Sequence, residues 1–560
     1  MGTFMKASSR TALWRVVASS LLLTLPSCCI PELRRAAPGP TLPDTFNGST
    51  STENSAQLGI DEFFNDPKLT DLINQAMVGN QELRILAEDV QIANNEVMRR
   101  RGAYLPFVTL GAGAGVDKPG LFTRGGAVDS QLDIRPGQSI PNPLPNFLVA
   151  TNISWQIDIW KKLRNARNAA ALRYLGTIEG RNYVVTRLVA EIAENYYTLL
   201  ALDKRLETLD RTIALQEQSL EVAKAKKLAA RDTELPVQRF QAEVRKNQSE
   251  KLIVKQEIIE AENRINFLVG RFPEPVARKS AEFIDLNPRS LSIGLPSQLL
   301  QNRPDIRQAE LELQAAGLDV RVARAQFYPS LTLNAGVGFE AFNPRYLFFT
   351  PESLIYTAAG ELVAPLINRL AIKADYLTAN ATQLQAIYNY QRVILNAFTE
   401  VVNRISKVEN YRQSIEIKKQ QLESLEASVA NASKLFQNAR AEYIEVLFAQ
   451  RDFNEARLVI IETKRQQLSA IVNTYQALGG GVGSLSLFNP GIPTEVLPPE
   501  PSTEEPDTNQ QPPAPPVPSA PAPSAPAPSA PTSAEAAPTP QEPVELVPVD
   551  TVPVDVGETK

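Results

Sequence analysis

The sequence predicts an α+β membrane protein: three copies of the chain form a 12-stranded β-barrel, four strands from each, continued by a long α-helical coiled-coil barrel. Three observations predict this fold class. Two long stretches carry an unbroken heptad repeat of apolar residues, four segments of about ten residues alternate between apolar and polar side chains, and the whole pattern occurs twice. The heptads indicate supercoiled helices, and the alternating segments indicate strands. The recurrence of the whole pattern indicates an internal tandem duplication.

The heptads of the two halves coincide when the chain is aligned with itself at an offset of 209 residues. Every paired position is apolar and every step is seven: Val185, Ile192, Leu199, Leu206, Ile213 and Leu220 fall on Ile394, Val401, Val408, Ile415, Leu422 and Val429. The chain therefore divides into a first repeat at residues 61–280 and a second at 281–486, each with helices and two strands.

Residues 160–230 and 367–438 are predicted to be helices of about 70 residues each. At 1.5 Å per residue, such a helix is roughly 100 Å long, enough for a duct across most of a periplasm. By itself, a heptad seam indicates such a duct no more than it indicates a solvated rod or a filament-forming coiled coil. The segments between the helices argue against that alternative.

Four segments between the helices are candidate strands, because successive side chains of a strand point to opposite faces. Residues 147–158 and 331–340 alternate most clearly, whereas 107–116 and 354–363 are weaker but similar in length and rich in small residues. About ten residues is the span that a tilted strand needs to cross a bilayer. A soluble sheet with one wet face is the alternative interpretation.

Four strands cannot close a barrel, and open edges in lipid leave backbone groups unpaired at several kcal/mol each. Closure therefore requires several copies of the chain. Three copies give 12 strands, which is wide enough for a pore, whereas two give 8, which side chains would fill. The closure argument predicts a homotrimer.

Composition excludes several classes of function. The chain has no histidine, which removes the usual general base and the commonest transition-metal ligand. Its net charge is −5 and we find no basic cluster typical of a nucleic-acid-binding protein. After the first 30 residues no stretch holds 18 consecutive apolar residues, so no transmembrane helix is predicted. We expect neither an enzyme nor a cofactor, with no catalytic and no metal-ligating residues and no nucleic-acid partner.

Both ends of the chain differ from its body. Residues 1–27 have the basic start and apolar run of a secretory signal peptide, and Cys28 stands where a bacterial lipoprotein is lipidated, although Pro26 departs from the usual pattern. A plain signal peptide is the alternative. Residues 28–60 would then be an extended, lipid-anchored linker. Residues 487–560 are rich in Pro, Ala and Ser with 11 acids and 1 base, which predicts a disordered acidic tail.

The motif from Leu299 through Arg303-Pro304-Asp305 to Ala309-Glu310, continued by Phe327-Tyr328-Pro329, resembles the mid-chain signature of TolC-like outer membrane factors. It is most similar to the lipoprotein branch that serves resistance-nodulation-division pumps. The resemblance covers roughly residues 60–482. It implies a trimeric outer membrane channel of a diderm bacterium, extending into the periplasm, with no catalytic residue and no cofactor.

The resemblance also implies partners and a gate. The partners are a periplasmic adaptor (membrane fusion) protein, an inner-membrane pump and outer-membrane lipid. The constricted end in the family is the periplasmic helix–helix turn, where the adaptor docks. The corresponding charged residues here are Arg231, Asp232, Glu234, Arg440, Glu442 and Glu445. We expect the two arginines to pair with these acids in neighbouring chains and to hold the mouth closed, whereas solvated charges on a helix tip are the alternative.

The function predicted from all these features is passive export: an outer membrane channel that conducts substrates received from an inner-membrane pump. The competing interpretation is a periplasmic coiled-coil adaptor or structural protein without a pore. Adaptors also carry coiled-coil hairpins, but they lack paired ten-residue alternating strands.

Overall fold

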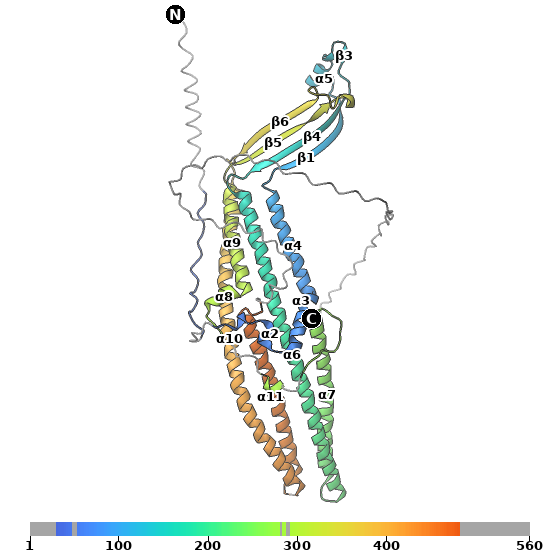
Figure 1. The fold of residues 1–560 in the computed structure, drawn as a ribbon, viewed down its shortest axis with the longest axis vertical. Helices are drawn as coiled ribbons and strands as arrows, with labels where there is room; N and C mark the ends of the chain where they lie inside the picture. The colour runs from blue at the N-terminus through green and yellow to red at the C-terminus, as the bar shows by residue number, and fades with distance from the viewer. Residues whose placement is uncertain (1–29, 47–52, 280–282, 287–291, 439, 482–560) are drawn as a thin grey trace, which may run out of the picture. The chain divides into compact units, whose positions relative to one another are not determined.

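The computed structural model describes residues 30–46, 53–279, 283–286, 292–438 and 440–481 (Figure 1). Its main elements follow one order twice: a helix, two strands and two long helices. The first set is α4 (Gln81–Gly102), β1 (Phe107–Asp117), β4 (Leu144–Ile157), α6 (Lys162–Leu228) and α7 (Glu234–Val269). The second set is α9 (Pro304–Ala325), β5 (Ser330–Ala341), β6 (Leu354–Val363), α10 (Leu370–Gln437) and α11 (Tyr443–Ala477). Corresponding helices differ in length by one residue at most.

Smaller elements surround these two sets. The helices α2 (Ile60–Phe64) and α3 (Pro67–Gly79) precede α4, and α8 (Ser297–Asn302) precedes α9. Between β1 and β4 lie α5 (Arg124–Asp129), β2 (Asp133–Arg135) and β3 (Gln138–Ser139). Three single turns of 3₁₀-helix complete the described elements: η2 (Ser55–Gln57), η3 (Phe283–Asp285) and η4 (Pro344–Tyr346).

The four long strands form one antiparallel sheet in the order β1-β4-β5-β6 (Figure 1). All four lie where the alternation of side chains predicts them. The largest difference is at β4, which begins three residues earlier than expected, at Leu144 opposite Asp117. Pro145 interrupts the alternation there, so the sequence pattern does not mark that end of the strand.

The two longest helices match the heptad stretches closely. They contain 67 and 68 residues, against an expected length of about 70. Helix α6 packs on α4, α7, α9 and α11, and α10 packs on α9 and α11. The largest core cluster lies where α6, α7 and α11 meet α2 and α3, and there the ring of Phe63 stacks on Tyr475 with centroids 4.0 Å apart. The heptad residues Ile192 and Leu199 are completely buried in it.

Residues 30–46, expected to be an extended linker, lie on α10. The side-chain amide of the buried Asn380 donates to the carbonyl of Arg34 at 3.2 Å and accepts from its N–H at 3.0 Å. Further along, Phe46 is 1% exposed and stacks on Phe398 with centroids 5.3 Å apart. The described part of this segment is therefore held along the helix by backbone hydrogen bonds and by an aromatic anchor.

Candidate functional site

The sheet has two faces of opposite character. Directly paired residues share a face, so the register assigns each side chain to one of the two. One face carries Val108, Leu110, Val149, Ile153, Trp155, Leu333, Val337, Phe339, Tyr356 and Leu362. The other carries Thr109, Asn152, Ser154, Gln156, Thr332, Asn334, Glu340, Thr357 and Glu361, together with the apolar Phe107, Leu148, Ile355 and Val363. An apolar face opposite a polar face is typical of strands with lipid on one side and water on the other.

Most of the apolar face and both sheet edges are uncovered within the described chain. Leu110 is 77% exposed and Tyr356 is 79% exposed. The edge strands β1 and β6 each pair with one neighbour among the described residues. On the polar face, the hydroxyl of Ser154 donates to Oδ1 of Asn334 at 2.9 Å. The polar face thus makes hydrogen bonds of its own, while the apolar face lacks a partner.

The turn between α6 and α7 is a tight helix C-cap. Ala230 adopts a left-handed conformation with φ of +57°, and its N–H donates to the carbonyl of Lys227 at 2.9 Å. The next N–H, that of Arg231, donates to the carbonyl of Lys226 at 2.9 Å. This pair of hydrogen bonds is the Schellman motif, which usually has glycine at the left-handed position.

The second turn, between α10 and α11, repeats part of this pattern. The N–H of Arg440 donates to the carbonyl of Leu435 at 2.9 Å, across the same spacing as Arg231 and Lys226. The N–H of Asn438 donates to the carbonyl of Lys434 at 3.1 Å. Both helix–helix turns therefore satisfy carbonyls of the preceding helix with N–H groups of the turn.

The six charged residues predicted for the gate lie at these two turns. Asp232 is half-buried and the other five are exposed. Glu234 forms an ion pair with Lys227, and the Asp232 carboxylate accepts from the N–H of Thr233 at 2.8 Å. Among the described residues, Arg231, Arg440, Glu442 and Glu445 form no ion pair within the chain. Their pairing between neighbouring chains stays a prediction.

The two turns are joined to each other within one chain. Leu220, Val237 and Phe240 of the first hairpin form a small core with Leu447 of the second. The side chain of Lys226, in the first hairpin, contacts Phe436 of the second. Its ammonium group donates to the carbonyl of Phe436 at 2.8 Å and lies 3.3 Å from the centroid of the Phe436 ring. Burial lowers the pKa of Lys226 below its ordinary value. The structure thus brings the predicted residues of both repeats to one end of the helical hairpins.

Arg303 of the Arg-Pro-Asp motif has a role that sequence reasoning did not assign. It is 4% exposed and forms a bidentate pair with Asp305 at 3.0 and 2.7 Å. It also donates to Glu400 of α10 at 3.1 Å and to the carbonyl of Ala477 of α11 at 2.8 Å. Burial opposes the charge, but the two carboxylates raise the pKa of Arg303. Arg303 therefore links the start of α9 to α10 and to the end of α11.

Asn80 makes the equivalent link in the first set of elements. Its amide donates to the carbonyl of Leu268 at 2.7 Å, and its Oδ1 caps α4 by accepting from the N–H of Leu83 at 3.0 Å. Leu268 and Ala477 are separated by the 209 residues that relate the heptads. The donors Asn80 and Arg303 are 223 residues apart, so the offset of the heptads gave no signal for this pair of links.

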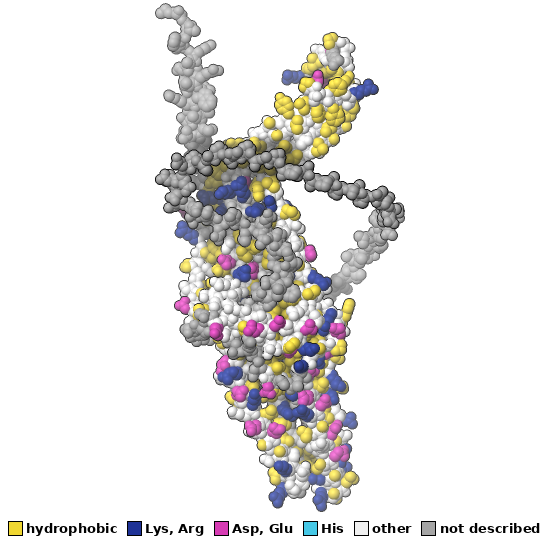
Figure 2. All heavy atoms as spheres, viewed as in Figure 1, with side chains coloured by type: hydrophobic (Ala, Val, Ile, Leu, Met, Phe, Trp, Pro, Cys, Tyr) yellow, Lys and Arg dark blue, Asp and Glu magenta, His cyan; other side chains and the backbone are white. Residues whose placement is uncertain are grey.

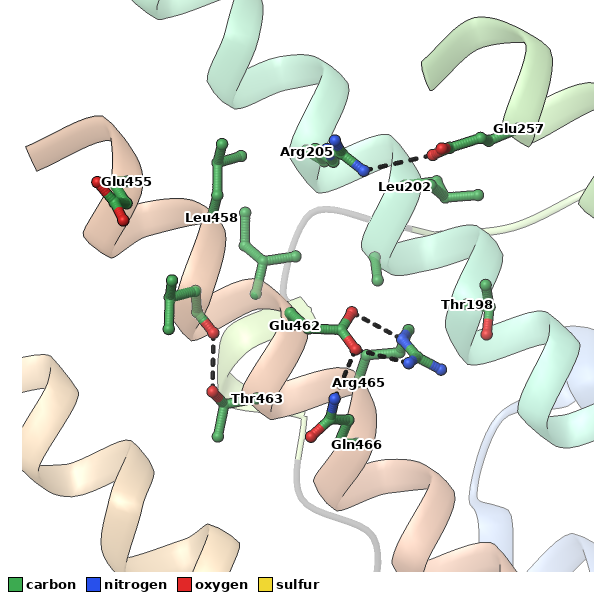
Figure 3. A pocket seen from close by; sticks show the side chains of 13 residues that line it. Thr198, Leu202, Arg205, Glu257, Glu455, Leu458, Glu462, Thr463, Arg465 and Gln466 are labelled. Atoms are coloured by element: carbon green, nitrogen blue, oxygen red, sulfur yellow. Dashed lines mark hydrogen bonds and ion pairs between the residues drawn. The ribbon is translucent and has the colours of Figure 1, made fainter. Parts of the chain in front are cut away.

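A cleft of about 640 Å³ lies between α6, α7 and α11 (Figure 3). Its apolar wall includes Leu202 and Leu458, and both of its arginines are paired with carboxylates. Arg205 lies 3.4 Å from Glu257, while Glu462 binds Arg465 at 2.6 Å and accepts from Gln466 at 2.7 Å. The hydrogen bond from Arg465 lowers the pKa of Glu462. With its arginines paired in this way, we assign no ligand to the cleft.

Three further expectations concern the anchor, metals and membrane spans. Cys28, the predicted lipidation site, lies outside the described residues. Within the part of the chain that the structure describes, no cluster of three or more His, Cys, Asp or Glu side chains could hold a metal ion. In that same part, no helix is both long and apolar enough to cross a membrane.

Comparison with known proteins identifies the family. The family model described as "Outer membrane efflux protein" matches residues 72–271 and again residues 295–480. The chain belongs to the outer membrane efflux protein family. The two matched ranges correspond closely to the two sets of elements in the fold.

Individual relatives are similar over most of their length. "Cation efflux system protein CusC" of Escherichia coli O6:H1 is 26% identical over 465 residues, which are 82% of this chain and 97% of CusC. "Probable outer membrane lipoprotein SilC" of Salmonella typhimurium is 25% identical over 474 residues, 83% of this chain and 98% of SilC. A crystal structure of CusC is similar over 81% of this chain and 99% of the CusC chain, with a TM-score of 0.70 and 24% sequence identity.

Family membership decides between the two functions that the sequence left open. The chain is an outer membrane efflux channel and resides in the outer membrane of a Gram-negative cell. The alternative of an adaptor or structural coiled coil without a pore is not favoured. The family consists of channel proteins and not of enzymes.

Proposed function

We propose that the protein is a passive, trimeric duct whose 12-stranded barrel crosses the outer membrane and whose helices continue the channel into the periplasm. The observation that carries the proposal is the sheet of four strands, whose apolar face is largely uncovered and whose edges are both unpaired among the described residues. Backbone groups at such edges cost several kcal/mol each in lipid unless they pair. Edge-to-edge pairing of β6 with β1 of the next copy satisfies both edges at once.

Three copies fit the geometry better than two. Twelve strands enclose a lumen, whereas side chains fill a barrel of eight. The polar face, with Asn152, Thr332 and Asn334, then lines the lumen, and the apolar face meets lipid. The recurring order of elements supports a tandem duplication with repeats at residues 61–280 and 281–486.

The ends of the chain complete the proposed organisation. Residues 1–27 are a signal peptide, Cys28 carries lipid at the start of a linker over residues 28–60, and residues 487–560 form a solvated tail. The name of SilC as an outer membrane lipoprotein supports the anchor. The docking of residues 30–46 on α10 gives the linker a fixed path that begins two residues after Cys28.

The proposed partners are a periplasmic adaptor and an inner-membrane pump. The adaptor docks at the two helix–helix turns, where Arg231, Arg440 and Glu445 are exposed. Cargo selection lies with the pump. CusC is named for cation efflux, yet this chain has no histidine, and Met77 and Met98 are the only methionines after residue 27. A duct that passes cargo on without binding it needs no ligand set of its own.

Two measurements on the full-length protein in detergent test the proposal. Native mass spectrometry is expected to show a trimer, and planar bilayers containing the protein are expected to show discrete conductance steps. A stable monomer or dimer would refute the closure argument. A trimer that conducts no ions, even after both Arg440 and Glu445 are replaced by Ala, would refute the duct.

A further inference from the structure

The tryptophans of the described chain lie where the strands join the helices. The indole N–H of Trp155, on the apolar face of β4, donates to the carbonyl of Tyr104 at 3.0 Å. The indole N–H of Trp160 donates to the carbonyl of Pro329 at 2.8 Å, and its ring stacks on Tyr328 with centroids 4.7 Å apart. Tryptophan and tyrosine side chains gather at the level of lipid headgroups, because their rings are apolar at one end and polar at the other.

Basic side chains are concentrated at the same junction. We define the junction collar as residues 96–106, 158–168, 319–329 and 361–375, where α4, α6, α9 and α10 meet the strands. The collar holds eleven basic and five acidic residues, a net charge of +6, although the whole chain carries −5. Figure 2 shows Lys and Arg side chains next to hydrophobic ones directly below the sheet. The opposite helix ends, residues 226–234 and 434–445, hold five bases and four acids.

Helix electrostatics explains only part of this charge. Arg99–Arg101 and Arg324 lie in the last turns of α4 and α9, where the helix dipole favours positive charge. The start of a helix favours negative charge, yet Lys161 is the N-cap of α6, Lys162 and Arg164 follow it, and the first turn has no acid. Its first N–H groups are already satisfied, since the carboxylate of Asp158 accepts from Leu163 at 3.0 Å and from Arg164 at 2.9 Å. The helix dipole therefore does not account for the bases at the start of α6.

Several bases of the collar are also accessible. Arg164, Arg321 and Arg324 are exposed and form no ion pair among the described residues. Arg99 and Arg100, in contrast, both pair with Glu96. Their hydrogen bonds lower the pKa of the Glu96 carboxyl group to about 2. The collar thus has exposed cations beside an apolar surface and an aromatic border, the combination that an anionic phospholipid matches with its phosphate and its acyl chains.

We propose that the junction collar binds anionic phospholipid headgroups in the leaflet nearest the helices. The proposal rests on the proposed function, because it requires the apolar face of the sheet to lie in the bilayer. Trp155 and Trp160 mark the depth of the headgroups, and the exposed arginines contact the phosphates. The collar then stops the sheet from sliding deeper into the membrane or out of it.

Lipid binding to the full-length protein in non-ionic detergent tests the proposal. Phosphatidylglycerol and phosphatidylcholine with the same acyl chains are titrated in turn, and native mass spectrometry counts the lipids retained. Because a basic residue near a membrane surface contributes about 1 kcal/mol, each exposed arginine favours phosphatidylglycerol by about fivefold. The collar variant Arg164→Gln, Arg321→Gln, Arg324→Gln should therefore lose at least about fivefold of the preference, and the corresponding Arg→Lys variant should keep it.

The matched control removes three exposed bases elsewhere: Arg239→Gln, Arg245→Gln and Lys255→Gln, all on α7. It should keep the preference, and 0.5 M salt should reduce the preference of the parent protein. Equal binding of both lipids by the parent overturns the proposal, as does an equal loss in the control and collar variants. Conductance separates the two hypotheses: a conducting protein without lipid preference refutes the collar alone, and a protein that does not conduct even after Arg440 and Glu445 are replaced by Ala refutes the duct.

Discussion

At the scale of single residues, the two repeats solve one structural problem with different side chains. Asn80 and Arg303 both precede a 22-residue helix, and each donates to the carbonyl near the end of the last helix of its set. The glycines that follow those carbonyls, Gly270 and Gly479, have φ of +85° and +89°. A Cβ on Gly479 would lie 2.5 Å from the carbonyl oxygen of Asn302, so only glycine fits there.

Replacement of Arg303 tests the link between the three helices. Arg303→Ala leaves the carboxylates of Asp305 and Glu400 without their buried partner and should lower the free energy of unfolding by about 2–4 kcal/mol. The control is Arg404→Ala, which removes another partner of Glu400 at 3.1 Å but at a more exposed position. That loss should stay below about 1 kcal/mol. Equal shifts of the thermal unfolding midpoint in the two variants would contradict the role of Arg303.

Lys464 of α11 gives the protein a predictable pH dependence. The residue is 3% exposed, and its side chain donates a hydrogen bond to Gln467 at 3.1 Å. Burial lowers the pKa of Lys464 to about 8. The positive charge of Lys419 lowers it further, whereas the carboxylates of Asp285 and Glu416 act in the opposite direction. Below pH 8 this lysine is charged in both the folded and the unfolded state. Between pH 8 and 10.5 the unfolded chain binds the additional proton, so this group makes stability rise with pH.

Lys464→Met should therefore remove that rise and should raise stability at pH 7 by on the order of 2 kcal/mol. Lys464→Arg stays charged in both states, so it should not raise stability at pH 7, and because arginine does not titrate in this range it should also lack the rise. The measurement is the unfolding midpoint at pH 7, 8, 9 and 10, compared with that of the parent. A parent curve parallel to the Lys464→Met curve over this range would show that Lys464 is not the group responsible.

At the scale of elements, periodic signals predicted the structure well and aperiodic ones did not. The heptads mark α6 and α10, and the alternation marks all four long strands, because each pattern follows from a repeated geometry. The docking of residues 30–46 on α10 depends on single contacts, such as Phe46 on Phe398, which no local pattern in the sequence reveals. The link through Arg303 was missed for the same reason, although its motif was noticed.

The turn between α6 and α7 has alanine at a position where glycine is usual. In the structure Ala230 takes the left-handed conformation, which costs an L-residue about 1 kcal/mol. Ala230→Gly should relieve this cost and slow hydrogen exchange at the end of α6. Ala229→Gly, at a φ of −82°, relieves nothing and should speed exchange there. Faster exchange in both variants would mean that Ala230 carries no strain.

At the scale of the whole molecule, the sequence predicted the class of protein more fully than its gate. Family membership and the sheet agree with the predicted channel, because amphipathic strands and heptads extend over many residues. Arg231, Arg440 and Glu445 do lie at the predicted helix ends. Whether they pair and hold the mouth closed depends on contacts between neighbouring chains. The sequence of one chain does not show which side chains come together across a symmetry axis.

The last prediction uses the two faces of the sheet. Leu110 and Thr109 are neighbours on β1, but the register places Leu110 on the apolar face opposite Thr151 and Thr109 on the polar face opposite Asn152. In the proposed barrel Leu110 meets lipid, where an arginine costs about 2–4 kcal/mol near the bilayer midplane and less toward its borders. Leu110→Arg should therefore reduce the yield of folded protein in the outer membrane, and Thr109→Arg, in the lumen, should preserve it and alter ion selectivity. Gel mobility with and without heating measures the folded fraction, and equal yields of the two variants would contradict a sheet with lipid on one face and water on the other.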